Sequence, residues 1–135
     1  MEVKMFLKNL DTDSKNKFMQ LICLAANIDK NCSNEELSII HNYQNELGIP
    51  VLPKIRSSAS ELIAYFSKFP ESARKMIYFE IYGLIRSDNL ITTDENDLLH
   101  DIEKNFGLGS DITQQIKMLA KKLQDVYSEL FSVLS

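Results

Sequence analysis

An internal repeat constrains this chain more than any other feature. Two apolar helical segments end at Asp29 and Asp88, and each is followed by a short turn and a second helical pattern. The two copies align without a gap at a constant offset of 59 residues, and the identical positions are Asp29/Asp88, Glu36/Glu95, His41/His100 and Gly48/Gly107. Self-similarity of this kind indicates a duplicated supersecondary unit. We therefore expect two helix-turn-helix units, at about residues 14–49 and 73–108, that superpose.

Local signals mark where the second helix of each unit begins and ends. Ser33–Glu36 and Thr92–Glu95 are capping boxes, in which the hydroxyl and the glutamate each accept a hydrogen bond from a free backbone N–H. Gly48 and Gly107 follow these helices and suit the left-handed conformation that commonly ends a helix. A further capping box, Ser58–Glu61, opens another helix between the two units.

Apolar residues at spacings of three and four predict the remaining helices. We expect a short first helix within Val3–Leu7, and the helix at about 71–87 has a wide apolar arc that places it at the centre of the fold. A last helix, at about 111–134, is capped by Ser110 or Asp111. No alternating run or hairpin turn indicates a strand. The prediction is an all-α, single compact helical bundle of six or seven helices that spans residues 1–135.

Composition limits the classes of protein to which this chain can belong. Its 135 residues are 44% apolar and 25% charged, which suits one domain with a sizeable core. A net charge of −4 gives no general attraction to nucleic acid or to an anionic membrane, and no apolar run is long enough for direct membrane insertion. Cys23 and Cys32 lie in apolar positions and are expected to be free thiols. We therefore expect a cytoplasmic protein.

The duplicated pattern resembles that of the TerB-like domains, which are named for a tellurite-resistance protein and include the N-terminal domain of the DjlA co-chaperone. The resemblance covers roughly Phe18 to Leu123. It implies a compact helical bundle with a pseudo-two-fold arrangement, a role in stress or phage defence, and acidic residues that bind a divalent metal. The family usually has glycine directly after the loop aspartate, whereas this chain has Lys30 and Asn89 there.

The acidic turns are the candidate metal site. Oxygen ligands suit Ca²⁺ or Mg²⁺, and the candidate ligands are Asp29, Glu36, Asp88, Asp94 and Glu95. A complete EF-hand is rejected, because the first loop positions carry residues such as Leu84 and Ala25 instead of oxygen ligands. The alternative is that the aspartates form Asx-turns while the glutamates complete the capping boxes.

Catalytic motifs are missing from the sequence. There is no nucleophile elbow and no glycine-rich phosphate loop. His41 and His100 have no second histidine or cysteine at zinc-binding spacing, and we interpret both as half-buried structural residues. We therefore expect that the protein is not an enzyme.

The expected function is that of a binding or scaffold module with a protein partner. Apolar residues of the last helix recur with a period of 3.5, and we expect its first half to pack across both repeat units. Its second half is expected to overhang the domain and offer Tyr127, Leu130 and Phe131 to a partner or to a second copy in a homodimer. The alternatives are a divalent-metal-responsive protein and a small acidic immunity or inhibitor protein with a basic partner.

Overall fold

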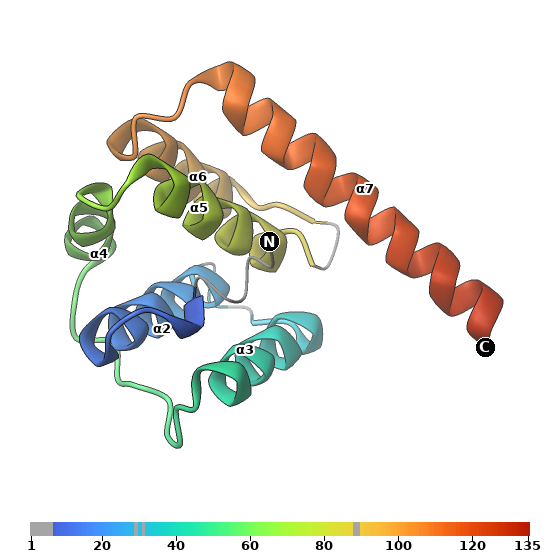
Figure 1. Cartoon of the computed structure of the whole chain (residues 1–135), viewed down its shortest axis with the longest axis horizontal. Helices are drawn as coiled ribbons and strands as arrows, with labels where there is room; N and C mark the ends of the chain where they lie inside the picture. The colour runs from blue at the N-terminus through green and yellow to red at the C-terminus, as the bar shows by residue number, and fades with distance from the viewer. Residues whose placement is uncertain (1–6, 29, 31, 88–89) are drawn as a thin grey trace.

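The computed structural model describes residues 7–28, 30, 32–87 and 90–135, and within them the regular structure is entirely helical. Figure 1 shows how the helices α2 (Thr12–Ala26), α3 (Asn34–Leu47), α4 (Ala59–Ser67), α5 (Glu71–Ile85), α6 (Thr93–Asn105) and α7 (Ser110–Leu134) are arranged. The prediction of an all-α fold is therefore confirmed. Most of the short helix expected within Val3–Leu7 lies outside the described residues, although Leu7 itself is buried.

The core is built around α2 and α5, which pack against each other. Helix α2 also contacts α3 and α4, while α5 contacts α3, α6 and α7. Phe18 and Ile22 of α2 are fully buried, and so are Ile77 and Ile81, which occupy the equivalent positions of α5 under the repeat offset. The prediction that α5 lies at the centre of the fold is correct, and α2 shares that position.

The predicted helix boundaries are present in both units. Ser33 and Thr92 each accept a hydrogen bond from the backbone N–H three residues on, and both capping boxes are complete. Gly48 and Gly107 follow their helices with φ of 67° and 66°, in the left-handed region that glycine adopts at little cost. These local features agree with a duplication, while the superposition of residues 14–49 on 73–108 stays a prediction.

Helix α3 corrects one expectation about its buried face. The apolar pattern of α3 predicts that Leu37 is buried together with Ile40 and Leu47, but the Leu37 side chain is 45% exposed. The buried residues of α3 are Glu36, Ile40, Tyr43 and Leu47, whose spacings of four, three and four form a single stripe. Leu37 lies one residue off this stripe, because the capping glutamate takes the buried position in the first turn.

The start of α7 and the surroundings of the histidines also differ from expectation. Gly109 is the N-cap of α7, since its carbonyl accepts the N–H of Thr113, so Ser110 and Asp111 already lie inside the helix. His41 and His100 are exposed, not half-buried, because both lie on the outer side of their helices. Both cysteines are free as expected, with Cys23 buried and Cys32 partly exposed.

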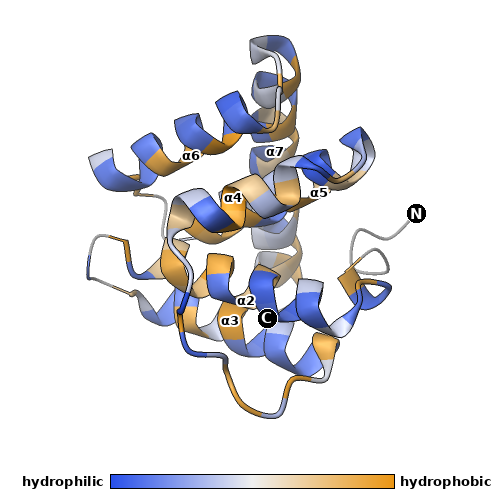
Figure 2. Cartoon of the chain, turned by 90° about the vertical axis from the view of Figure 1, so that its left-hand side faces the viewer, coloured by the Kyte–Doolittle hydropathy of each residue, from blue (hydrophilic) through white to orange (hydrophobic). Residues whose placement is uncertain are grey.

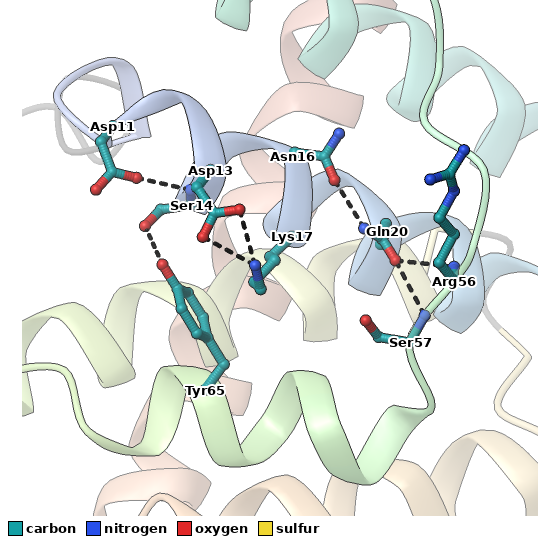
Figure 3. A network of polar contacts seen from close by, with 9 residues as sticks. All are labelled: Asp11, Asp13, Ser14, Asn16, Lys17, Gln20, Arg56, Ser57 and Tyr65. Atoms are coloured by element: carbon teal, nitrogen blue, oxygen red, sulfur yellow. Dashed lines mark hydrogen bonds and ion pairs between the residues drawn. The ribbon is translucent and has the colours of Figure 1, made fainter.

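Polar contacts attach α4 and the segment before it to α2, as Figure 3 shows. The buried Gln20 side chain accepts hydrogen bonds from the backbone N–H groups of Arg56 and Ser57 at 3.1 and 3.3 Å. Ser14 and the Tyr65 hydroxyl share a hydrogen bond of 2.6 Å. A buried amide that satisfies two backbone donors fixes the course of the connecting segment between α3 and α4.

Helix α6 covers the part of the core that α4 and α5 form. Figure 2 shows hydrophilic residues along its outer side and hydrophobic residues on the side toward α4 and α5. Leu98, Leu99 and Ile102 form its buried stripe. The turn at Gly107 then leads into α7, which is the longest helix of the structure.

Candidate partner-binding surface

The first half of α7 is anchored to the core. Thr113 is buried, and Ile116 and Ala120 pack against the core cluster. The main packing partner of α7 is α5 of the second unit, so the expected packing across both repeats is not the principal contact. Lys117 adds a polar attachment, because its ammonium lies 3.3 Å from the Glu103 carboxylate of α6.

Glu103 connects three helices at this anchor. The Tyr78 hydroxyl of α5 donates a hydrogen bond to its carboxylate, Lys117 approaches from α7, and His100 lies 3.3 Å away on α6. Burial raises the pKa of the Glu103 carboxyl, but the Tyr78 hydrogen bond and the Lys117 charge outweigh burial and hold the pKa below its usual value. Burial and the same hydrogen bond raise the pKa of Tyr78. The cluster therefore holds α5, α6 and α7 together as a charged, hydrogen-bonded unit.

The second half of α7 extends away from the rest of the protein, as Figure 1 shows. Its large apolar side chains are exposed: the exposed fraction is 55% for Tyr127, 47% for Leu130 and 73% for Phe131. Val133 and Leu134 are exposed by 80% and 78%. Several large apolar side chains exposed next to one another on one helix are typical of an interaction site.

A groove runs between this half of α7 and the body of the protein. It has a volume of about 900 Å³ and is bounded by α3, α5 and α7. Tyr127 and Phe131 line it, whereas Leu130 is not among the lining residues. The apolar part of the opposite wall is formed by Ile39 and Phe79 together with the largely buried Tyr43. The three predicted partner-surface residues therefore divide between the groove and the neighbouring side of α7.

Charge on the groove walls is mainly negative. Glu35 and Glu46 of α3 and Glu80 of α5 line the groove, and Arg86 is the basic residue among the lining residues described. The Tyr43 hydroxyl donates a hydrogen bond to Glu80, which connects α3 to α5 beneath the groove. Acidic walls around an apolar floor favour a ligand that carries apolar and basic groups together.

The predicted metal ligands divide between described and undescribed residues. Asp29 and Asp88 lie outside the described residues. The side chains of Glu36 and Glu95 are buried, and one oxygen of each accepts the N-cap backbone N–H at 3.0 and 2.9 Å. Asp94 is exposed in the first turn of α6. Among residues 7–28, 30, 32–87 and 90–135, no three histidine, cysteine or acidic side chains form a group that could hold a metal ion. The metal hypothesis stays a prediction.

Sequence reasoning did not find the groove residues of α3 and α5. Ile39, Glu46 and Phe79 belong to helices that are far apart in the sequence, and nothing in their spacing indicates that they meet α7. The repeat aligns Ile39 with Leu98 but does not indicate which residues either side chain meets. The one sequence pattern that indicated a binding surface is the apolar period of α7, which leaves the second half of this helix with a broad apolar side.

In the part of the chain that the structure describes, no helix has the length and apolar character needed to cross a membrane. Comparison with protein-family models, with curated proteins and with solved structures found no match for this chain.

Proposed function

We propose that this chain is a non-enzymatic binding module whose groove between α3, α5 and α7 receives an amphipathic helix with basic flanking residues from another protein. The observation that carries this proposal is the exposed apolar wall formed by Tyr127 and Phe131 opposite the acidic side chains of α3 and α5. A helix that lays its apolar face into a hydrophobic groove is a recurrent mode of peptide recognition. The acidic walls supply orientation and selectivity.

The resemblance to TerB-like domains supports a scaffold role in stress or defence. Lys30 has a φ of 61°, which is a conformation that glycine adopts most readily, and TerB-like domains usually have glycine at this position. Its N–H bonds the Asn27 carbonyl at 2.9 Å. A lysine that keeps a glycine-like conformation between α2 and α3 fits the proposed family fold.

The groove charge also fits the narrower alternative of a small acidic inhibitor. Glu35, Glu46 and Glu80 outnumber Arg86 on the groove walls. An inhibitor would use the same surface against a basic partner, and the identity of that partner distinguishes it from a scaffold. Both forms of the function require that basic helices bind the groove in preference to acidic ones.

Two synthetic peptides test this requirement. Both form an amphipathic helix with the same leucine stripe, and one has lysine and the other glutamate at the flanking positions. We expect the labelled lysine peptide to bind the full chain in a fluorescence anisotropy titration, with affinity that falls as salt rises. The glutamate peptide should bind at least tenfold more weakly, since like charges face each other across the groove.

Reversal of charges in the groove tests the origin of this preference, and reversal of charges on α6 is the matched control. Glu35→Lys combined with Glu46→Lys should weaken binding of the lysine peptide and strengthen binding of the glutamate peptide. Asp97→Lys combined with Asp101→Lys, on the exposed side of α6, changes the net charge by the same amount away from the groove and should leave both affinities unchanged. Equal affinity for the two peptides, or equal effects of the groove and α6 variants, would overturn the proposal.

A further inference from the structure

Helix α7 carries a second apolar face beside the groove. Ile116, Leu119, Leu123, Val126, Leu130 and Val133 recur at alternating spacings of three and four, and we call this set the α7 seam. From Leu119 to Val133 its side chains are exposed by 44–80%, and only Leu123 also lines the groove described above. Apolar residues at these spacings are the a and d positions of a coiled coil.

Charged residues beside the seam show which orientation of two helices fits. With Leu123 at an a position and Val126 at a d position, the flanking g positions are Lys122 and Glu129. When two copies of α7 run antiparallel with Leu123 of each opposite Val126 of the other, Lys122 of one copy lies near Glu129 of the second. The two-fold symmetry repeats this pair, so two attractive pairs lie along the side of the seam where the g positions of the two helices meet, one toward each end.

A parallel pair does not match these charges. In a parallel coiled coil, g positions face e positions of the other helix, which here are Ala120 and Tyr127. Lys122 would then face Tyr127, and Glu129 would face Leu134. The parallel orientation therefore forms no ion pair, and the charge pattern favours the antiparallel one.

A second, smaller groove lies where the antiparallel partner would end. In the antiparallel register, Val133 of the second copy lies opposite Ile116. A groove of about 360 Å³ is located there, lined by Ile116 and Leu119 of α7 and by Met76 and Phe79 of α5. The end of the second helix would cover this apolar surface, so the seam and this groove form one continuous interface.

We infer that the α7 seam binds a second copy of this chain, with the two α7 helices antiparallel and Lys122 of each beside Glu129 of the other. The inference goes beyond the proposed function, because the seam lies on a different side of α7 from Tyr127 and Phe131. The second copy is favoured over an unrelated helix by the self-complementary charges and by the groove at the expected end of the seam.

Two charge variants of the full chain test the register by mixing. Lys122→Glu alone places glutamates opposite each other, and Glu129→Lys alone places lysines opposite each other. In sedimentation velocity, we expect each variant to dimerise roughly tenfold more weakly than the unchanged chain. An equimolar mixture should regain dimers, because each mixed pair places glutamate opposite lysine at both of the symmetry-related 122/129 contacts.

A second pair of variants separates the seam from helix stability. Leu130→Glu places a charge within the seam and should abolish the dimer, whereas Ser132→Glu adds the same charge on the outer side of the helix and should preserve it. Circular dichroism should show equal helix content for both variants. An unchanged chain that stays monomeric at high concentration, or a mixture of charge variants without restored dimers, would overturn the inference. Binding of the lysine peptide by such a monomer would still support the proposed function.

Discussion

Glu103 is the residue through which the long helix is attached to the rest of the protein. Its carboxylate accepts the Tyr78 hydroxyl of α5 and lies 3.3 Å from the Lys117 ammonium of α7. Its pKa is below the usual value because these two groups outweigh the effect of burial. A carboxyl whose pKa falls on folding stabilises the protein above its unfolded-state pKa, and this stabilisation is lost as the pH falls through the folded-state value.

Glu103→Gln tests this attachment as a function of pH. The variant should be less stable than the unchanged chain at neutral pH by about 1 kcal/mol, and the difference should shrink as the pH falls below the reference pKa of 4.5. Urea unfolding at a series of pH values measures it. Glu71→Gln, at an exposed ion pair with Lys75, is the control and should cost little at any pH. A Glu103 effect that is independent of pH would show that the carboxylate charge does not stabilise the cluster.

Substitutions that alter the backbone preference at single residues should change the free energy of unfolding, and the direction of the change depends on the local φ. Lys30 pays a steric penalty at its φ of 61°, so Lys30→Gly should raise the free energy of unfolding by about 0.5–1 kcal/mol. Gly48→Ala should lower it by about 1 kcal/mol, because alanine is strained at a φ of 67°. Gly83→Ala, inside α5 where an added Cβ meets no atom within 4 Å apart from the adjoining backbone of the helix, should raise it by about 0.5–1 kcal/mol. Chemical denaturation measures all three, and a stabilising Gly48→Ala would contradict the assigned helix end.

At the scale of the helices, their limits could be predicted where a few neighbouring residues determine them. The capping boxes at Ser33, Ser58 and Thr92 depend on residues three apart, and all three are present in the structure. Leu37 shows where such reasoning ends, because its burial depends on which side of α3 meets α2. The groove depends on three helices that meet in space, and no local pattern specifies such a meeting.

The length of α7 explains why its two halves differ. Helix α7 has 25 residues and α5, on which it packs, has 15. At about 1.5 Å per residue, α7 is roughly 15 Å longer than its support, so its second half lacks a helix of the same length beneath it. A wide apolar arc favours packing on the core, which the first half satisfies and the second half leaves open to a binding partner.

At the scale of the whole molecule, α7 offers two surfaces with different partners. The side with Tyr127 and Phe131 faces the acidic groove, and the side with Leu130 forms the seam. A dimer held by the seam presents two grooves, and a partner with two basic helices would bind it by avidity far more tightly than one groove alone. The proposed binding and the proposed self-association therefore use neighbouring surfaces, which share Leu123 of α7 and Phe79 of α5.

The central claim is that the second half of α7 is a binding surface and is not part of the folded core. Thermal unfolding of a chain that ends after Gln124 tests this claim most directly, compared with the full chain at a concentration where both are monomeric. We predict cooperative unfolding of the shortened chain with a midpoint close to that of the full chain, because the removed apolar side chains are exposed in the structure. A shortened chain that has lost cooperative unfolding would contradict the claim and assign the whole of α7 to the core.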